Sequence, residues 1–255
     1  MAKRIEDFVV TENIRLTGDI FILELTTGNK IPGLLPGQFV QVKVEGSPGT
    51  FLRRPISIHD LDYGMNTIRL LIQVAGKGTS KLSFLQKGES VNLIYPLGNS
   101  FSKPDLGSKI LLVGGGCGVA PLLFLGKYLK SNGYSPEVLL GFRDSGHILE
   151  YDEYKKIGPV HLTTEDGSEG EKGFVTEHSV LKEFRFDHIC CCGPELMMKA
   201  VARYSLENGI NCEVSLENLM GCGFGVCLCC VVSTVRGNLC SCTDGPVFNI
   251  KELRW

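Results

Sequence analysis

Cysteines close to the C-terminal end form the most specific chemical pattern of the sequence. Four residues separate Cys222 from Cys227, two separate Cys227 from Cys230, and eleven separate Cys230 from Cys242. Four thiolates that converge on two irons hold a plant-type 2Fe-2S cluster, and this is the spacing typical of such a site. The spacing therefore predicts an iron-sulfur site at residues 222–242.

Glycines surround the first of these cysteines. Gly221, Gly223 and Gly225 can adopt positive φ and let backbone N–H groups approach closely. The sulfurs of an iron-sulfur cluster carry negative charge, which such N–H groups stabilise. The glycines thus favour a loop wrapped around an anionic inorganic core.

Two other interpretations of the cysteines compete with this one. Four cysteines also suit zinc, but structural zinc sites usually pair two short C-x-x-C units and only one is present here. A disulfide cluster is disfavoured by the odd total of eleven cysteines and by the lack of a signal peptide. Cys229 and Cys240 are surplus, and on spacing alone either Cys240 or Cys242 can supply the fourth ligand.

Composition sets the class of protein. The chain has 255 residues, 43% of them hydrophobic and 21% charged, which is an ordinary globular composition with room for one large or two medium domains. A formal net charge of -2 with no basic run argues against binding to nucleic acid. The polar N-terminus and the lack of a long apolar run predict a cytoplasmic protein without a membrane anchor.

The first hundred residues read as an antiparallel barrel. Short alternating or β-branched runs extend from Phe8 to about Asn99, and Gly and Pro turns separate them. One helix is expected over residues 78–86, with Thr79 or Ser80 as its N-cap.

Strands alternate with helices after Pro104, which predicts a parallel α/β sheet. A glycine-rich turn over residues 114–121 joins a buried strand to an amphipathic helix, where a pyrophosphate can meet N–H groups. A tight βα connection with no ligand is the plainer interpretation. Cys190 and Cys191 read as core residues, whereas Cys192 ends its strand before Gly193 and Pro194 and can help to position a nicotinamide ring.

A second candidate ligand segment lies in the barrel half. Arg54 can pair with a phosphate and Ser57 can donate to a flavin ring, while Pro55 fixes the entry into the strand. A surface arginine before an edge strand is the competing interpretation. The five histidines lack metal spacing and are expected to be structural or on the surface.

The order of these motifs resembles that of the ferredoxin reductase superfamily. Residues 54–57 resemble its flavin-binding R-x-Y/F/I-S segment, Gly78 and Thr79 its phosphate-binding helix start, and residues 96–101 its P-L-G-x-x-F. Residues 114–121 and 192–194 resemble its G-G-G-x-G-x-A-P and C-G-P motifs.

The C-terminal residues narrow the resemblance. Residues 215–227 and 242–248 are similar to the electron-transfer subunits of the class 1B dihydroorotate dehydrogenases, and the similarity covers nearly the whole chain. In that family the fourth ligand directly precedes x-D-G-P-V-F, which implies Cys242.

This resemblance implies a division of labour. A partner subunit would oxidise dihydroorotate to orotate on its own FMN, in a two-plus-two heterotetramer of pyrimidine (UMP) biosynthesis. Electrons would pass through the 2Fe-2S cluster and FAD of this chain to NAD+, so cofactors rather than catalytic side chains would carry the chemistry. No acid-base pair that would act on an organic substrate is visible in the sequence.

The implied arrangement is a FAD-binding β-barrel over residues 1–103, an NAD-binding α/β domain over 104–213 and a small cysteine-rich module over 214–255. Ile72 and Gln73 depart from the aromatic and basic residues common in the family, so their contacts are expected through the backbone. Cys117 replaces an aliphatic residue and suggests sensitivity to oxidation. The expected cofactor residues are Arg54, Pro55, Ile56, Ser57, Leu71, Ile72, Gln73, Gly78 and Thr79 for FAD, and Gly114, Gly115, Gly116, Gly118, Cys192, Gly193 and Pro194 for NAD.

Other functions fit the same motifs. The flavin and iron-sulfur subunit of a ferredoxin:NADP oxidoreductase, a hydrogenase or a sulfite reductase shares the cysteine spacing and nearly the same tail. The Asp244-Gly-Pro-Val-Phe248 segment favours the dihydroorotate enzyme. A zinc-stabilised interaction module without enzymatic activity is the alternative from another class, and it would be colourless.

Overall fold

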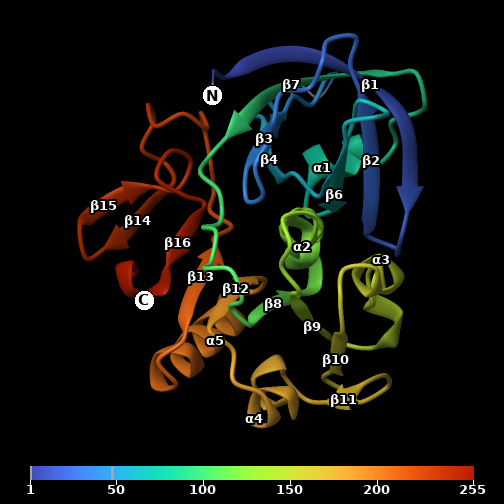
Figure 1. Ribbon diagram of the computed structural model, residues 1–255. Helices are drawn as coiled ribbons and strands as arrows, with labels where there is room; N and C mark the ends of the chain where they lie inside the picture. Colours follow the sequence, from blue (N-terminus) through green and yellow to red (C-terminus); the bar gives the residue numbers. More distant parts are fainter. Residues whose placement is uncertain (1, 47–48) are drawn as a thin grey trace.

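The computed structural model describes residues 2–46 and 49–255. Within these ranges the strands form two seven-stranded sheets and one hairpin, with the N-terminal sheet above and the helix-flanked sheet below in Figure 1. The C-terminal segment, drawn in red, lies beside both sheets. The predicted fold class, a β domain followed by an α/β domain and a cysteine-rich segment, is confirmed.

The N-terminal sheet is a half-open antiparallel barrel. Its strands follow the order β4-β3-β7-β1-β2-β6-β5, and β4 and β5 are its unpaired edges. Apolar side chains such as Phe8, Leu23 and Ile68 are completely buried inside it. The strands are β1 (Arg4–Arg15), β2 (Ile20–Thr26), β3 (Phe39–Val42), β4 (Arg54–Ser57), β5 (Asp60–Asp62), β6 (Thr67–Gln73) and β7 (Ser90–Leu97).

The helix between β6 and β7 is shorter than expected. Helix α1 spans Lys77–Leu82, and its N-cap is Gly76 rather than Thr79 or Ser80. Thr79 instead stands at the third helical position, where its Oγ1 accepts hydrogen bonds from the backbone N–H groups of Ala75 (2.9 Å) and Gly76 (3.2 Å). A hydroxyl inside the first turn of a helix can thus accept hydrogen bonds from N–H groups that precede the helix. The sequence alone did not show whether Thr79 stands at the N-cap or within the first turn.

The second sheet is parallel except at one edge. Its order is β11-β10-β9-β8-β12-β13-β16, and β16 alone runs antiparallel to its neighbour β13. Its strands are β8 (Ile110–Gly115), β9 (Glu137–Phe142), β10 (Val160–Thr164), β11 (Glu171–Lys172), β12 (His188–Cys192), β13 (Asn211–Ser215) and β16 (Val247–Asn249). The helices are α2 (Ala120–Ser131), α3 (Tyr151–Lys155), α4 (Val180–Glu183) and α5 (Glu195–Glu207), with short 3₁₀ turns η1 (Gly116–Val119), η2 (Ser145–His147) and η3 (Val175–Glu177).

Helices α2 and α5 cover opposite faces of this sheet. Leu122 and Leu125 of α2 belong to the same core as Cys190, whereas Val201 of α5 shares a core with Cys191. This alternation along β12 is the two-residue period of a strand buried on both faces. The prediction that Cys190 and Cys191 are core residues is confirmed, because both are buried.

The C-terminal segment is tied to the second sheet. After β13 the chain forms a loop, the hairpin β14 (Val231–Thr234) and β15 (Gly237–Cys240), strand β16 and the 3₁₀ turn η4 (Ile250–Glu252). The predicted boundary between residues 213 and 214 therefore falls inside β13, and the boundary between 103 and 104 falls between β7 and β8.

A buried polar cluster joins the barrel to helix α2 and the segment before α3. The ring of His59 lies 2.8 Å from the carbonyl oxygen of Ala120 through Nδ1 and contacts the carboxylate of Glu150 through Nε2. Arg69 Nη2 lies 3.2 Å from the same carboxylate. Through His59 and Arg69 the barrel thus contacts both the start of α2 and the residue before α3.

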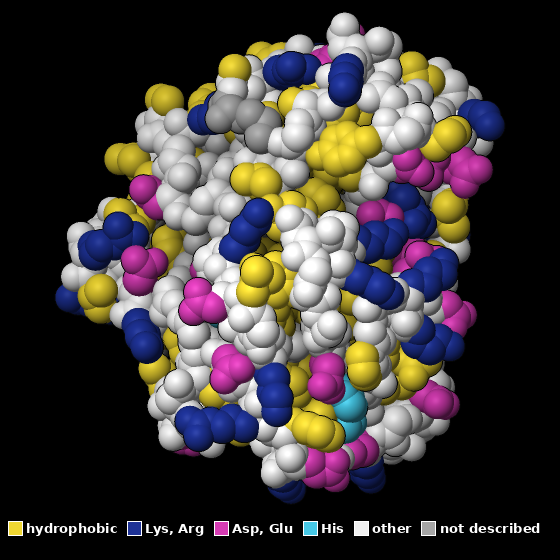
Figure 2. All heavy atoms as spheres, in the orientation of Figure 1, with side chains coloured by type: hydrophobic (Ala, Val, Ile, Leu, Met, Phe, Trp, Pro, Cys, Tyr) yellow, Lys and Arg dark blue, Asp and Glu magenta, His cyan; other side chains and the backbone are white. Residues whose placement is uncertain are grey.

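Charged side chains of both signs are interspersed over the face shown in Figure 2. No large field of one sign is present on that face, in keeping with a net charge of -2. Among residues 2–46 and 49–255, no helix combines the length and the apolar character that a membrane crossing requires.

Candidate functional site

The loop that carries the predicted iron ligands aims backbone N–H groups at cysteine sulfurs. Gly225 N lies 3.2 Å from Cys242 Sγ, and Phe224 N lies 3.4 Å from Cys222 Sγ. Cys222 N lies 3.4 Å from Cys227 Sγ. These contacts bring three of the four predicted ligands into one constellation of sulfurs and N–H donors.

The three glycines of this loop act differently from one another. Gly223 and Gly225 both have φ of +82°, as predicted. Gly221 does not have positive φ, so that part of the prediction is wrong. Its lack of a side chain instead leaves room for a sulfur, because a Cβ there would lie 3.1 Å from Cys227 Sγ.

The N–H groups make the loop favourable for thiolates. Burial acts to raise the pKa of Cys222, but hydrogen bonds from the backbone of Phe224, Cys227 and Val226 outweigh it and lower this pKa to about 6. A ligand thiol must lose its proton to bind iron. The donor set of this loop therefore fits an anionic iron-sulfur cluster.

The remaining cysteines of the segment differ in burial. Cys230 and Cys242 are buried against Phe39 of β3, and Cys240 lies in the same small apolar cluster. Burial and neighbouring Cys230 raise the pKa of Cys242 to about 12 and also raise that of Cys240. The hydrogen bond from Gly225 distinguishes Cys242, because it links this sulfur to the glycine loop. Cys229 is exposed.

The predicted flavin residues meet at the opening of the barrel. Strand β4 is an edge strand, and it lies against β6 without a ladder between them. Strand β5 covers β6 only from Thr67 to Arg69, so the backbone edge of residues 71–73 has no strand partner there within the described ranges. Leu71 and Ile72 bury their side chains in the cores. Contacts from these two residues to a flavin must therefore run through the backbone.

Arg54 is placed for an anion. Its Nη1 donates only to the carbonyl oxygens of Leu52 (2.9 Å) and Arg53 (3.3 Å), and it has no carboxylate partner among residues 2–46 and 49–255. A Cβ on Gly78 would lie 2.7 Å from Arg54 Nε, so the guanidinium sits directly on the start of α1. A guanidinium and helical N–H groups side by side fit a phosphate.

Arg53 has a different function despite its adjacent position. Its guanidinium donates to Asn92 Oδ1 (2.5 Å) and to the carbonyl oxygens of Asn92 (3.0 Å) and Gln41 (3.2 Å). Arg53 therefore ties β7 to β3 and is a structural residue.

The predicted nucleotide residues flank the point where the parallel sheet reverses its order. From β8 the chain adds β9 and β10 on one side, and β12 and β13 follow on the other. The glycine turn follows β8 and the Cys192-Gly193-Pro194 turn follows β12, so both lie at the carboxyl ends of adjacent strands. Open α/β sheets bind their ligands in this crevice.

Close approach of the two turns requires glycine. A Cβ on Gly118 would lie 2.3 Å from the Cα of Gly193, and a Cβ on Gly115 would lie 2.4 Å from Met197 Sδ. Gly116 adopts φ of +52°. The 3₁₀ turn η1 also lies against β6, so the nucleotide turn adjoins the flavin strands.

Burial shifts the pKa values of the cysteines in this crevice upward. Burial raises the pKa of Cys117 to about 12, with nearby carboxylates adding to the shift, so its thiolate is scarce at neutral pH. The sensitivity of Cys117 to oxidation stays a prediction, because its side chain is half-buried. Cys192 is buried at the end of β12, and burial raises its pKa well above the usual range.

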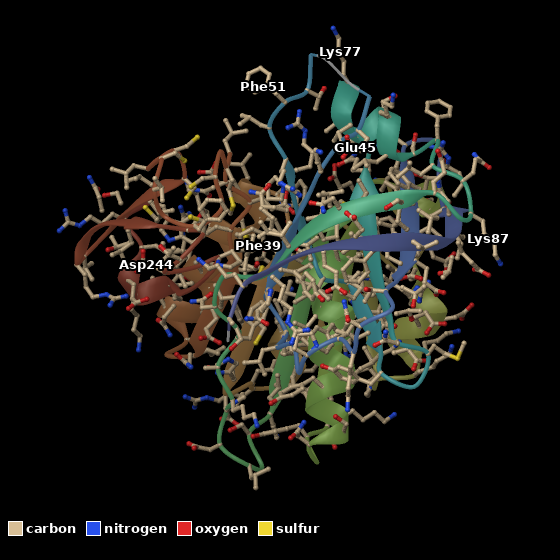
Figure 3. All side chains as sticks on the ribbon, turned by 90° about the horizontal axis from the view of Figure 1, so that it is seen from above. Phe39, Glu45, Phe51, Lys77, Lys87 and Asp244 are labelled. Carbon is tan, nitrogen blue, oxygen red and sulfur yellow. The ribbon has the colours of Figure 1, made fainter. Side chains whose placement is uncertain are left out.

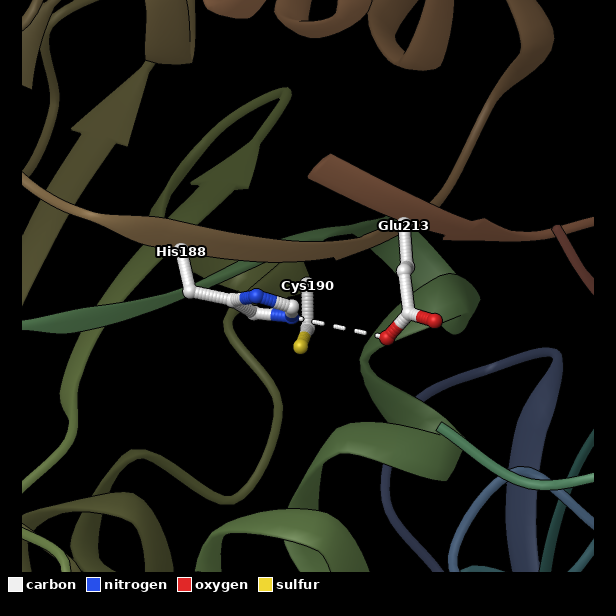
Figure 4. Close-up of side chains that lie close together, drawn as sticks. All are labelled: His188, Cys190 and Glu213. Atoms are coloured by element: carbon white, nitrogen blue, oxygen red, sulfur yellow. Dashed lines mark ion pairs between the residues drawn. The ribbon is translucent and has the colours of Figure 1, made fainter. Parts of the chain in front are cut away.

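A second group of potential metal ligands forms a structural link instead. His188, Cys190 and Glu213 are buried close together in the parallel sheet (Figure 4). Glu213 Oε2 already accepts hydrogen bonds from Ser102 N (3.0 Å) and Oγ (2.9 Å), and His188 Nε2 lies 3.4 Å from it. Burial acts to raise the pKa of Glu213, but its His188 and Ser102 partners outweigh it and lower the pKa.

Sequence reasoning missed the residue that fastens the cysteine segment to the barrel. Asn99 Nδ2 donates to the carbonyl oxygens of Asp244 and Val247, both at 2.8 Å, and its Oδ1 accepts from Val247 N at 3.0 Å. An asparagine after P-L-G gives the sequence no more than a turn signal. Its paired contacts across 148 residues of chain are visible only in the fold.

Family models match all three parts of the chain. The iron-sulfur cluster binding domain of dihydroorotate dehydrogenase B matches residues 217–254, an oxidoreductase NAD-binding domain matches 112–203, and an oxidoreductase FAD-binding domain matches 7–101. The predicted cofactors FAD, NAD and an iron-sulfur cluster are thereby confirmed at the level of domains.

Whole-chain relatives agree with these matches. The chain is 39% identical over 249 residues to the dihydroorotate dehydrogenase B (NAD(+)) electron transfer subunit of Clostridium perfringens, covering 96% of each chain. It is 39% identical over 225 residues to that of Shouchella clausii, covering 86% of each. It is also similar to a solved NADH-dependent reduced ferredoxin-NADP oxidoreductase structure, with a TM-score of 0.88 and 30% identity over 97% of this chain and 90% of that one. The chain belongs to the family of dihydroorotate dehydrogenase B electron transfer subunits.

Proposed function

We propose that this chain passes electrons from the oxidation of dihydroorotate, carried out by an FMN-containing partner subunit, to NAD+ in pyrimidine biosynthesis. The observation that carries the proposal is the cysteine loop with its N–H donors, in a chain 39% identical to a named electron transfer subunit over 96% of its length. Dihydroorotate itself would be oxidised in the partner.

Cys222, Cys227, Cys230 and Cys242 are the proposed cluster ligands. The N–H groups of Phe224 and Gly225 favour the negative charge of the sulfurs. When bound, the cluster carries single electrons and the flavin exchanges hydride with nicotinamide, which is the chemistry that the protein itself lacks. The chain then contributes position, exclusion of water and electrostatic stabilisation.

The FAD would lie along the opening between β4 and β6. Arg54 and the start of α1 would bind its pyrophosphate, and the backbone of Leu71, Ile72 and Gln73 would border the ring together with Pro55, Ile56 and Ser57. Thr79 supports this site from within α1 by fixing the turn before it.

The NAD+ would bind in the crevice between the turns after β8 and β12. Gly114, Gly115, Gly116 and Gly118 supply a backbone that a phosphate can approach closely. Cys192, Gly193 and Pro194 end the neighbouring strand and would border the nicotinamide, beside the flavin strands that η1 contacts.

The partner would dock over the cysteine loop. Leu219, Phe224, Val226 and Leu228 are apolar and exposed around the proposed ligands, with Leu219 88% and Val226 80% exposed. Exposed apolar side chains concentrated on one loop are typical of an interaction surface. A two-plus-two assembly with the FMN subunit is the proposed stoichiometry.

A second function has its own supporting observation. The similarity to the ferredoxin-NADP oxidoreductase structure covers 97% of this chain, so the same cofactors can serve a partner of that kind. Identity of 30% to that chain against 39% to the dihydroorotate subunit favours the first proposal.

Co-purification of the untagged chain with its native partner distinguishes the two. We expect a yellow-brown complex with iron, sulfide, FAD and FMN that reduces NAD+ only when dihydroorotate is added. A complex that ignores dihydroorotate but responds to reduced ferredoxin would overturn the pathway and leave the cofactor assignment standing. A colourless chain with stoichiometric zinc would overturn both.

A further inference from the structure

Gln41 is a buried amide that the fold leaves without a partner. Its side chain is completely buried in β3, and neither Nε2 nor Oε1 has a hydrogen-bond partner among the described residues. Burying an amide with no partner is costly, so native proteins rarely leave one unpaired. Gln41 therefore points to a group that completes its hydrogen bonds in the working protein.

The side chain of Gln41 lies on the face of β3 that the cysteine segment covers. Val40 and Val42 point into the barrel core, whereas Phe39, two residues before Gln41, packs against Cys230 and Cys242. Figure 3 shows Phe39 where the barrel strands meet the C-terminal segment. Because side chains alternate along a strand, Gln41 shares the side of Phe39.

Contacts with the cysteine loop place the amide beside the proposed ligands. A Cβ on Gly223 would lie 2.9 Å from Gln41 Nε2 and 2.9 Å from its Cγ. Gly223 directly follows Cys222, whose sulfur accepts from the N–H of Phe224. The loop thus passes directly over the amide, and its glycine leaves the space that the amide occupies.

The backbone of Gln41 also connects to the proposed flavin strand. Gln41 pairs with Pro55 of β4, and Arg53 Nη1 donates to its carbonyl oxygen at 3.2 Å. Gln41 therefore lies on the strand that separates the two proposed cofactor sites.

We propose that Gln41 donates a hydrogen bond from its side-chain amide to a sulfur of the iron-sulfur site and thereby raises the reduction potential of that site. Reduction adds negative charge to the cluster, and a fixed N–H donor in a buried location stabilises the reduced form more than the oxidised form. Gln41 acts through the cofactor, so it is a positioning and tuning residue. This inference rests on the iron-sulfur assignment proposed above.

Substitution of Gln41 tests the proposal through the potential. Gln41→Leu keeps the approximate size and removes the donor, and Gln41→Glu replaces the amide with an acceptor. In the purified holo-complex, a potentiometric titration followed by electron paramagnetic resonance should show the cluster of Gln41→Leu about tenfold harder to reduce, which is about 59 mV for a one-electron couple. Gln41→Glu should shift the potential at least as far in the same direction.

Gln38 provides the matched control. It is also buried, but its Oε1 accepts from Leu35 N at 2.9 Å and its Nε2 lies 3.4 Å from the carbonyl oxygen of Gly98. Gln38→Leu should lower stability without moving the cluster potential. A shift in Gln38→Leu as large as that in Gln41→Leu would overturn the inference, because loosening of the barrel would then explain both.

If a Gln41 variant loses the cluster, its potential cannot be measured. A second measurement therefore uses the unmodified protein. With glutamine labelled by ¹⁵N in its side chain, pulsed electron paramagnetic resonance of the reduced cluster should detect a nitrogen coupling. A full complement of iron and sulfide with no such coupling, or an unchanged potential in Gln41→Leu, overturns this inference alone. A protein that purifies without iron and sulfide overturns the proposed function as well.

Discussion

The cysteine loop and the nucleotide crevice carry chemistry in opposite ways. In the loop, side chains are the proposed ligands and backbone N–H groups approach their sulfurs, as with Gly225 N at 3.2 Å from Cys242 Sγ. In the crevice, the backbone is the proposed binding surface and side chains are missing from it, since a Cβ on Gly118 would lie 2.3 Å from the Cα of Gly193. The cysteine loop is therefore defined by the side chains that it carries, and the crevice by positions that lack a side chain.

This difference explains why the sequence predicts the ligand of the cysteine loop more specifically than that of the nucleotide crevice. A cysteine at a fixed spacing is rare and chemically committed, so residues 222–242 predicted their cofactor directly. A glycine turn has many structural uses, so residues 114–118 became specific only when the topology placed them beside β12. Substitution of a proposed ligand in the cysteine loop should therefore abolish cluster binding, whereas a substitution in the crevice should weaken nucleotide binding by degrees.

The largest expected effect is the loss of the cluster in Cys222→Ser. A serine hydroxyl is a much poorer iron ligand than a thiolate, so we expect near-complete loss of iron, sulfide and visible cluster absorption. FAD content should persist, because the barrel is a separate sheet. Cys242→Ser should behave in the same way.

Cys229→Ser and Cys240→Ser are the matched controls. Cys229 is exposed beside the loop, and Cys240 lacks the hydrogen bond that links Cys242 to Gly225. Both variants should keep the cluster. Retention in Cys242→Ser together with loss in Cys240→Ser would reverse the ligand assignment.

Arg54→Ala should give the next largest effect, on FAD affinity. Arg54 is the charged side chain proposed to bind the FAD pyrophosphate. A hydrogen bond to a charged group is worth about 1.5–3 kcal/mol. The dissociation constant for FAD should therefore rise about 10- to 100-fold, measured by fluorescence after removal of the flavin. Lys77→Ala, which removes an equal charge from an exposed position of α1, should change it little. Equal effects of the two would show that net charge, not placement, binds the flavin.

Much of the fold followed from local signals. Helix α5 (Glu195–Glu207) begins where Gly193 and Pro194 interrupt the strand before it and ends shortly before Gly209, all of which are local sequence signals. Strand β13, Asn-Cys-Glu-Val-Ser, has no clear local signal, because a glutamate interrupts its apolar residues. Glu213 is tolerated in a buried strand since Ser102 donates to it and His188 Nε2 lies 3.4 Å away, and neither residue is near it in sequence.

The sequence predicts the site most specifically where side chains are the proposed ligands. Spacing indicated the cluster cysteines, but the choice of Cys242 over Cys240 needed the resemblance, and the hydrogen bond from Gly225 now supports it. The unpaired amide of Gln41 had no sequence signal, because an outward-facing polar residue on a strand normally meets solvent. A buried polar residue of this kind is recognised only when the fold shows which segment covers it.

Gly118→Ala tests the crevice directly. Insertion of a methyl group 2.3 Å from the Cα of Gly193 must separate the turns after β8 and β12, at a typical overpacking cost of about 1–3 kcal/mol. We expect the KM for NAD+ to rise about tenfold with little change in cluster absorption. Gly28→Ala, at a position with nothing within 4 Å, should leave both unchanged. An unaltered KM in Gly118→Ala would argue against the crevice as the nucleotide site.

The smallest expected effect concerns how the two regions are attached to the barrel. The nucleotide domain is joined to it through charges, with Glu150 contacting His59 and Arg69, whereas the cysteine segment is joined through the uncharged amide of Asn99. Burial acts to raise the pKa of Glu150, but His59 and Arg69 outweigh it and lower this pKa below its ordinary value of 4.5.

A lowered folded-state pKa fixes the sign of the pH dependence. The stabilisation from Glu150 is complete above the unfolded-state value of 4.5 and is lost as the pH falls below it toward the folded-state value. Glu150→Gln should therefore lower the free energy of unfolding by about 1 kcal/mol at pH 7, the scale of one hydrogen bond, and the difference should shrink at acidic pH. Asn99→Ala should destabilise by an amount that does not depend on pH in this range, because amides do not titrate. Urea unfolding of both variants at pH 7 and pH 4 measures this contrast. A Glu150→Gln effect that is constant with pH would show that shape rather than charge holds the nucleotide domain in place.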